Sequence, residues 1–394
     1  MKSIKFFPGL NALRFIAAYL VVIHHAESVK ESRGLPNLHE WTVFSLGGVA
    51  VSFFFVLSGF LITYLLLKEH KEYGGVSIQK FYMRRVIRIW PLYFLLVFIG
   101  LAIVPLLTQW FSVAYELPYK VSDVLWYYIF FMPFVVSAQY GYSLLYPLWS
   151  IGVEEVFYVL WAPVVRFLIK FLPPIFFMVI AIRLSWGYYY EFVDTTHPVM
   201  TKIATTFGMD AMAIGGLGAY FVFHTRRPIG SYRLFGTGAQ LLLLGLLGVR
   251  FLFHETLANR EGLLSGIYQW IFMTPVFGTV LMNGLFLWLI LNISLNERRL
   301  FNVNYPFLEW LGSLSYGIYM YHLLVIFGIV YGIGGVLFEY SGWVSFVGYH
   351  GLIMIGTIGI SYLSKHFFED YFIGMRKYFV QKRKKEVKQS RVKR

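Results

Sequence analysis

The sequence predicts an all-α, polytopic integral membrane protein with about ten membrane-spanning helices and both termini in the cytoplasm. Three observations support this fold class. Of the 394 residues, 58% are hydrophobic and only 14% are charged, which is too few charges for the surface of a soluble protein of this size. The hydrophobic residues gather in long runs. The basic residues gather between these runs and at the C-terminus.

The length of the apolar runs predicts helices rather than strands. A helix needs about 20 residues to cross a bilayer, whereas membrane strands would show segments of about ten residues with alternating polarity. Ten continuous runs have the helical length, and they cover residues 8–27, 43–67, 89–109, 147–165, 173–190, 203–224, 234–253, 266–292, 307–335 and 343–364.

The distribution of Lys and Arg predicts the orientation, since cytoplasmic loops carry an excess of both. Both termini are basic, so both are expected to be cytoplasmic and the number of crossings to be even. Ten spans place the basic loops at 68–88, 166–172, 225–233 and 293–306 in the cytoplasm. This count requires that a shorter apolar run at 122–138 does not cross. We therefore expect that run to be interfacial or re-entrant on the outer side.

The two ends of the chain carry different information. Residues 376–394 hold ten Lys or Arg and one acidic residue, and so supply +9 of the net charge of +14. We expect a basic cytoplasmic tail that marks topology and contacts anionic membrane lipid, not nucleic acid. The first apolar run contains Arg14 and lacks a cleavage site, so it is predicted to be a span rather than a signal peptide. The absence of cysteine excludes disulfides and thiolate chemistry, and no metal site is expected.

Ionisable residues inside the first span are candidates for function. Arg14 and His25 are eleven positions apart, which places them on one helix face, about 16 Å apart along the axis. Two interpretations stay open at this point. Both side chains take part in chemistry, or Arg14 extends to the inner interface and His25 is an interfacial histidine.

A cluster of arginines precedes the third apolar run. Arg85 and Arg88 are neighbours on a helix at i and i+3, and Arg84 shares a face with Arg88 at i and i+4. Guanidinium groups suit phosphate oxygens because they donate two hydrogen bonds in a fork. The alternative is ordinary positive-inside charge.

Two adjacent carboxylates, Glu154 and Glu155, lie in the run that begins near Trp149. Ser150, Glu154 and Tyr158 recur at i, i+4 and i+8 and so share one stripe, while Glu155 points elsewhere. Burial should raise the pKa of at least one carboxyl group, which suits acid–base catalysis. A structural capping role is the alternative.

Other polar residues lie at mid-membrane positions. Ser58 and Gly59 in the second run suit close helix packing. Ser315, Tyr319 and His322 form a polar stripe that is suited to a sugar or a carbonyl, or equally to hydrogen bonds between helices.

Arg183 and Asp210 fall at similar depth in neighbouring runs. Opposite charges buried in lipid are stable only when they are paired. We therefore predict a buried structural ion pair between them.

In order and spacing, these motifs resemble the membrane-bound acyltransferase-3 family. The similarity extends over nearly the whole chain and rests on five motifs. These are Arg14-x10-His25, Ser58-Gly-Phe-Leu, Arg85-x-x-Arg88 followed by Ile-Trp-Pro, Trp149-Ser-Ile-Gly-Val-Glu-Glu-Val-Phe-Tyr and Leu311-Gly-Ser-Leu-Ser-Tyr-Gly-Ile-Tyr-Met-Tyr-His322.

The resemblance implies an enzyme of the inner (plasma) membrane, with one transmembrane acyltransferase domain over residues 1–375. Such an enzyme transfers an acyl group, usually acetyl, from cytoplasmic acyl-CoA to a hydroxyl of an envelope glycan or lipid-linked saccharide. Acetyl-CoA is then the co-substrate, without a metal. Some relatives carry an additional extracytoplasmic domain, so we expect this chain to complete the transfer itself or with a separate partner.

The resemblance and the chemistry of the residues together imply roles at the site. His25 is the expected general base, helped by Ser150 and by Glu154 or Glu155, with Glu154 favoured as the group that orients the imidazole. The expected acyl-CoA-binding residues are Arg14, Arg84, Arg85 and Arg88. The expected acceptor-binding residues are Ser58, Trp149, Tyr316, Tyr319 and His322.

Several alternatives stay open. The acceptor, the acyl group, the oligomeric state and the choice between direct transfer and an acyl-histidine intermediate do not follow from the sequence. A transporter or flippase of a lipid-linked saccharide is the main competing hypothesis, because intramembrane Arg, Glu and His also mark transport paths. The sequence shows no inverted repeat of the kind common in transporters.

Overall fold

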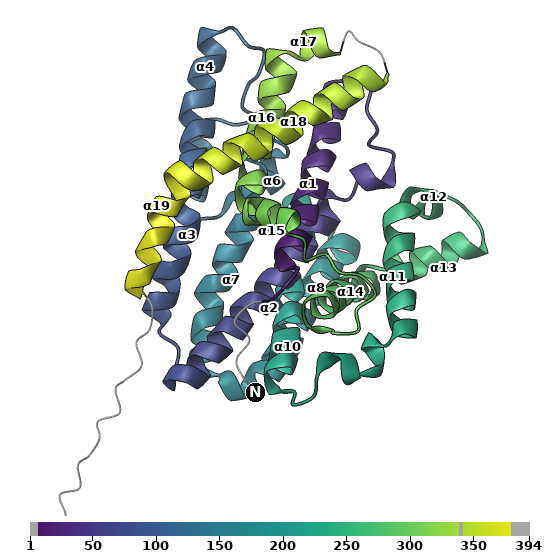
Figure 1. The fold of residues 1–394 in the computed structure, drawn as a ribbon. Helices are drawn as coiled ribbons and strands as arrows, with labels where there is room; N and C mark the ends of the chain where they lie inside the picture. The colour runs from purple at the N-terminus through teal and green to yellow at the C-terminus, as the bar shows by residue number, and fades with distance from the viewer. Residues whose placement is uncertain (1–6, 339–341, 380–394) are drawn as a thin grey trace, which may run out of the picture.

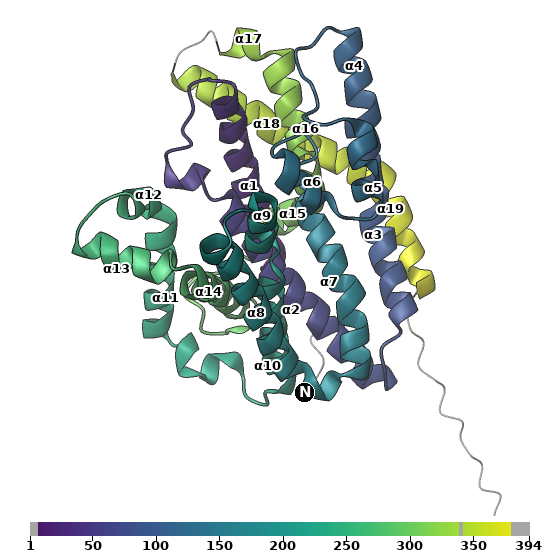
Figure 2. The same cartoon turned by 180° about the vertical axis from the view of Figure 1, so that it is seen from behind.

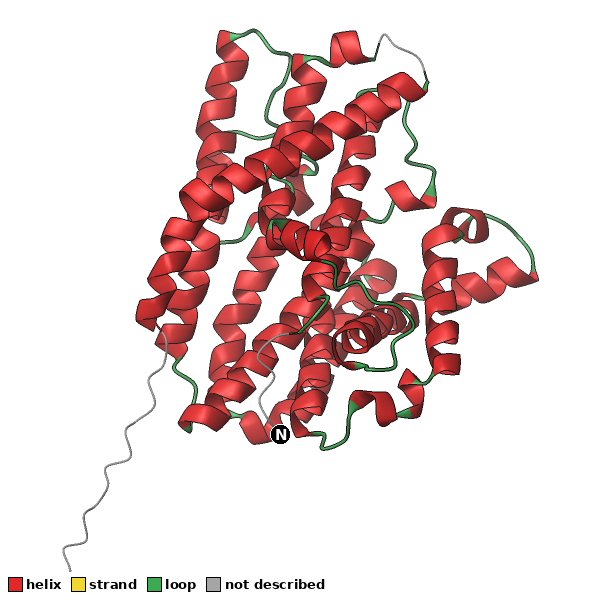
Figure 3. Cartoon of the chain, in the orientation of Figure 1, coloured by secondary structure: helices red, strands yellow, loops and turns green. Residues whose placement is uncertain are grey.

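The computed structural model describes residues 7–338 and 342–379. Within these ranges every regular element is helical (Figure 3). The long helices are α1 (Leu10–Ser32), α2 (Gly47–Tyr73), α3 (Ile78–Phe98), α7 (Leu148–Phe167), α8 (Leu172–Tyr188), α10 (Met209–His224), α11 (Thr237–Leu252), α14 (Pro275–Leu295), α16 (Ser315–Gly332) and α18 (Trp343–Ser364). Shorter helices are α4 (Val104–Trp110), α5 (Val121–Ile129), α6 (Pro133–Tyr140), α9 (Pro198–Thr206), α12 (His254–Ala258), α13 (Leu263–Phe272), α15 (Pro306–Ser313), α17 (Gly334–Leu337) and α19 (Asp370–Gly374).

The predicted membrane fold is confirmed. In the described part of the chain, nine helical segments are long and apolar enough to cross a bilayer, and each coincides with a predicted run. The tenth predicted run, 234–253, forms α11, which has only 16 residues. The run at 122–138 forms α5 and α6, of nine and eight residues, and each is too short to span. The predicted orientation stays a prediction. Residues 380–394 of the predicted tail lie outside the described ranges.

Two predicted runs are interrupted where the site is built. The run at 203–224 breaks at Phe207 and Gly208, between α9 and α10. The run at 307–335 breaks at Leu314, between α15 and α16. Hydropathy does not record such breaks, because the residues on either side remain apolar.

The central helices α2 and α10 approach each other so closely at one point that only a glycine fits there. α1 and α2 run through the middle of the bundle beside α7 and α10, whereas α11, α12 and α13 stand apart on one side (Figures 1 and 2). A Cβ atom at Gly59 of α2 would lie 2.0 Å from the carbonyl oxygen of Met212 in α10. Gly59 therefore has the helix-packing role that was one interpretation of its motif.

Candidate active site

Two separate cavities lie within the bundle. The first, which we call the basic cavity, has a volume of about 480 Å³ and is lined from α1, α2, α3, α7 and α16. The second, the His25 cavity, has a volume of about 390 Å³ and is lined by His25, Trp149 and residues of α2 and α8 to α10. Val51, Phe55 and Tyr319 line both. The two cavities thus share a wall of three side chains.

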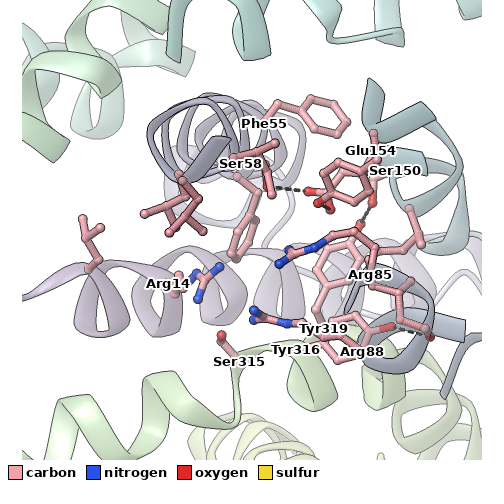
Figure 4. A pocket seen from close by; sticks show the side chains of 18 of the residues that line it. Arg14, Phe55, Ser58, Arg85, Arg88, Ser150, Glu154, Ser315, Tyr316 and Tyr319 are labelled. Carbon is pink, nitrogen blue, oxygen red and sulfur yellow. Dashed lines mark hydrogen bonds between the residues drawn. The ribbon is translucent and has the colours of Figure 1, made fainter. Parts of the chain in front are cut away.

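Arginines converge on the basic cavity. The guanidinium groups of Arg14 from α1 and of Arg85 and Arg88 from α3 point toward one another in Figure 4. The helical spacing of three residues places Arg85 and Arg88 on the same face of α3, as expected. None of the three forms an ion pair with any residue that the structure describes.

Arg85 is the clearest example of an arginine in this cavity without a hydrogen-bonding partner for a buried atom. Its side chain is buried, and its guanidinium lies 5.7 Å from the ring centre of Phe81 and 5.8 Å from that of Tyr158. Its Nε atom is buried without a hydrogen-bond partner. A buried, unpaired guanidinium is costly. The basic cavity is therefore suited to an anion that supplies the missing acceptors.

Glu154 faces these arginines across the basic cavity. The Ser58 hydroxyl donates to Glu154 Oε1 at 2.8 Å (Figure 4), and the Tyr158 hydroxyl donates to Oε2 at 2.7 Å. Ser150 also lines the cavity, so the predicted stripe of α7 is present. Glu155 lines neither cavity, and its Oε1 atom is buried without a hydrogen-bond partner.

Hydrogen bonds hold the shared wall closed at Tyr319. Its hydroxyl lies 2.7 Å from Ser150 Oγ and donates to the carbonyl of Pro147 at 3.1 Å. Tyr316, one turn earlier in α16, donates to the carbonyl of Ile89 at 3.1 Å and lines the basic cavity beside Ser315. Both predicted tyrosines thus border the basic cavity, and Tyr319 reaches the His25 cavity as well.

The His25 cavity contains a histidine with an oriented ring. His25 Nδ1 lies 2.9 Å from the hydroxyl of Tyr142, and the ring stacks on that of His322 with centroids 5.2 Å apart. Burial raises the pKa of the Tyr142 hydroxyl well above its usual value, so Tyr142 contacts the imidazole as a neutral phenol.

His322 lies behind His25 rather than in a cavity. Its Nδ1 donates to the carbonyl of Tyr319 at 2.6 Å, because a carbonyl oxygen can only accept. Nε2 then carries a lone pair and has no partner. His322 is fully buried and lines neither cavity. It can support the His25 ring but does not reach the space where a substrate would bind.

The predicted ion pair is confirmed in the wall of the His25 cavity. Arg183 Nε lies 3.0 Å from Asp210 Oδ1, and Asn283 donates to Asp210 Oδ2 at 3.2 Å. Arg183 also donates to the carbonyl of Thr205. Asp210 lies in the first turn of α10, where the helix dipole favours a carboxylate. These contacts brace the break between α9 and α10.

The structure corrects one expected contact. Glu154 does not orient His25, because its two oxygens accept from Ser58 and Tyr158 in the basic cavity. His25 has Tyr142 as a polar partner instead, a residue of the loop before Pro147 that was not among the predicted site residues. The signal was present as three tyrosines, Tyr140, Tyr142 and Tyr146, directly before the carboxylate motif.

Arg84 also lies apart from the other predicted arginines. It forms an ion pair with Glu69 at 2.6 Å and does not line the basic cavity. Lys68 and Arg376 line that cavity instead, and neither was predicted. Within the described ranges, no group of three or more His, Asp or Glu side chains is arranged to hold a metal ion.

Comparison with known proteins places this geometry in context. Residues 7–365 match the acyltransferase-3 family model, which is described as an acyltransferase domain. A Staphylococcus aureus (strain COL) protein named "Putative O-acetyltransferase" is 32% identical over 161 residues, which are 40% of this chain and 24% of the relative. O-acetyltransferase OatA of Staphylococcus aureus (strain NCTC 8325) is 30% identical over 184 residues, 44% of this chain and 27% of OatA.

These matches have a limited extent. The aligned part of the chain spans about a quarter of the length of the curated relatives that it matches. No solved structure matches the chain.

Proposed function

The chain belongs to the acyltransferase-3 family, and we propose that it is a membrane O-acyltransferase. In this proposal it transfers an acyl group, acetyl by preference, from acyl-CoA to a hydroxyl of an envelope glycan or lipid-linked saccharide. The observation that carries the proposal is the pair of cavities. One is lined by unpaired arginines, the other contains an oriented histidine, and a wall of three side chains separates them.

The basic cavity is the proposed donor site. Acyl-CoA carries phosphates at one end and the thioester at the other. Arg14, Arg85 and Arg88 would bind phosphate oxygens through charge-assisted hydrogen bonds. The thioester would then extend along Ser58, Tyr316 and Ser150 to Tyr319 at the shared wall. Positive-inside charge supports a cytoplasmic opening for this cavity in the inner (plasma) membrane.

The His25 cavity is the proposed acceptor site. Trp149 offers an aromatic face there, and Asn283 and Thr205 offer polar groups of the kind that recognise a sugar. The cavity opens on the opposite, extracytoplasmic side in this scheme. The name O-acetyltransferase, which the matched relatives bear, supports an oxygen acceptor.

The reaction that we propose is direct transfer with His25 as general base. In the proposed tautomer His25 Nδ1 keeps its proton and donates a hydrogen bond to the Tyr142 oxygen, which leaves the lone pair of Nε2 free. Nε2 removes the proton of the acceptor hydroxyl as its oxygen attacks the thioester carbonyl carbon. A C–O bond forms, the C–S bond breaks, and the CoA sulfur leaves and takes up the proton from the imidazolium. Tyr319 must move from Ser150 for the carbonyl to meet the acceptor.

Thioester consumption by the purified protein tests the proposal. Wild type in detergent is given labelled acetyl-CoA with an envelope glycan extract, and CoA release and acceptor labelling are measured. We expect both, and we expect glycan labelling to require the protein. If wild type consumes no thioester but moves a lipid-linked saccharide across reconstituted vesicles, the transporter hypothesis replaces the enzyme.

A further inference from the structure

The Arg84 side chain connects α3 to the C-terminal part of the described chain. Its Nη2 atom is 2.6 Å from Glu69 Oε2, and its Nη1 atom donates to the carbonyl of Phe379 at 3.1 Å. Glu69 Oε1 accepts from the backbone N–H of Ser77 at 2.9 Å. One arginine therefore joins the end of α2, the start of α3 and the short helical segment Met375–Phe379.

This connection positions Arg376. Arg376 lies in the same short helical segment, one 3₁₀ turn before Phe379. The bond from Arg84 to Phe379 thus sets the distance of this turn from α3. Arg376 lines the basic cavity with Arg85 and Arg88. It lies beyond residues 7–365, the part of the chain that the family model matches.

The charges around Arg376 favour an anionic ligand. The charges of Arg88 and Arg84 both repel that of Arg376. Glu69, the carboxylate that pairs with Arg84, is already engaged by Arg84 and by the backbone N–H of Ser77. Arg376 itself forms no ion pair with a described residue. A cation held close to other cations, without a counter-charge, is stabilised when a bound anion supplies one.

Arg85 and Arg376 differ in exposure, and this difference indicates which part of the donor each would contact. Arg85 is 9% exposed, whereas Arg376 lines the same cavity as an exposed residue, which places it nearer the outside of the bundle. The thioester of acyl-CoA must reach the shared wall inside the bundle, so the 3′-phosphoadenosine at the other end of the molecule stays nearest the opening. The geometry points to Arg376 as a donor-binding residue that contacts the 3′-phosphate of acyl-CoA, with Arg84 as the positioning residue that holds it there. This inference rests on the proposed function.

The test compares two donors that differ only in that phosphate. KM and kcat are measured for acetyl-CoA and for 3′-dephospho-acetyl-CoA with the full-length protein. We expect R376A to raise the KM for acetyl-CoA about tenfold, as loss of one charge-assisted hydrogen bond does. Its KM for the dephospho donor and its kcat should not change. The preference of wild type for acetyl-CoA should therefore disappear.

Three further variants test whether the effect is specific to Arg376 and to its contact with Arg84. K377A is the matched control, because Lys377 lies 5.2 Å over the ring of Tyr378 and does not line the cavity; it should behave as wild type. R84Q should raise the KM for acetyl-CoA in the wild-type background and add nothing in the R376A background, since it acts through Arg376. R376K should restore part of the donor preference.

The outcomes separate this inference from the proposed function. If wild type consumes acetyl-CoA and R376A keeps the full preference over the dephospho donor, the role of Arg376 is wrong and the enzyme stands. An R84Q effect of equal size in both backgrounds would refute the positioning role. If wild type consumes neither thioester, both proposals fail.

Discussion

The two cavities differ in whether the arginines that line them have ion-pair partners. In the basic cavity, Arg14, Arg85 and Arg88 face one another without ion pairs, and Arg85 Nε has no hydrogen-bond partner. In the wall of the His25 cavity, Arg183 is neutralised by Asp210 and the His25 ring is held by Tyr142. Arg183 therefore has a counter-charge, although the exposed Lys202 in the same lining forms no ion pair with a described residue. Under the proposed function, the arginines of the basic cavity bind an anionic donor, whereas His25 in the second cavity acts as the base.

Removal of the base should have the largest effect. H25A should lower kcat for acetyl transfer by about 10²- to 10⁴-fold, the usual contribution of a general base. Binding of acetyl-CoA should persist, because His25 does not line the basic cavity. Isothermal titration and a transfer assay measure the two separately. H366A is the control, because His366 is exposed, lines neither cavity and has its Nδ1 atom 2.9 Å from the carbonyl of Tyr362. Near-normal transfer by H25A would remove His25 from the mechanism.

Loss of the ion pair should have the next largest effect, on folding rather than on chemistry. D210N should lower the free energy of unfolding by about 3–5 kcal/mol, the cost of leaving one buried partner unpaired. R183Q should do likewise, and the R183Q/D210N double variant should recover stability. Thermal unfolding in detergent measures all three.

D123N provides the matched control for that series. Asp123 also lies in the first turn of a helix, α5, but is exposed, so its loss should be nearly neutral. If the double variant is no more stable than either single variant, the side chains do not act as a pair.

The basic cavity should respond through donor affinity. R85A and R88A should each raise the KM for acetyl-CoA by about tenfold to a hundredfold with little change in kcat, because the proposed contacts to the donor are the same in the ground and transition states. R166A is the control, since Arg166 is exposed and lies over the ring of Phe167. A fall in kcat at unchanged KM would place these arginines in the chemical step instead.

The hydrogen bond to the imidazole should contribute least. Y142F should lower kcat by less than about tenfold, since a neutral hydrogen bond contributes about 0.5–1.5 kcal/mol. KM for acetyl-CoA should not change. Y188F, which alters an exposed tyrosine at the end of α8, serves as the comparison. A loss as large as that of H25A would show that Tyr142 takes part in proton transfer itself.

Periodicity within a helix could be predicted from the sequence, and contacts between helices largely could not. The stripe of Ser150, Glu154 and Tyr158 follows from 3.6 residues per turn, and all three line one cavity. The Arg183–Asp210 pair also followed, because opposite charges in lipid have few alternatives to pairing. Glu154 was predicted beside His25 although it lies in the other cavity, because the relative placement of α1 and α7 is not encoded in either run alone.

Two pairs of adjacent residues also have contacts that could not be predicted from the sequence. Ser58 bonds to Glu154, whereas its neighbour Gly59 contacts the backbone of α10. Arg85 lines the basic cavity, whereas Arg84 turns to Glu69 and Phe379. Neighbours on a helix point about 100° apart, so one motif serves two purposes. Which residue serves which purpose depends on the helix that happens to lie beside it.

The shared wall also matters for the membrane as an insulator. Val51, Phe55 and Tyr319 line both cavities, so these three side chains form the boundary between the two hollows in the described part of the chain. If the two cavities open toward opposite sides of the bilayer, as proposed, a gap in this boundary would let protons cross an energised membrane. In that arrangement the hydrogen bonds of Tyr319 to Ser150 and Pro147 would have a second role, as the contacts that keep the membrane tight to ions between turnovers.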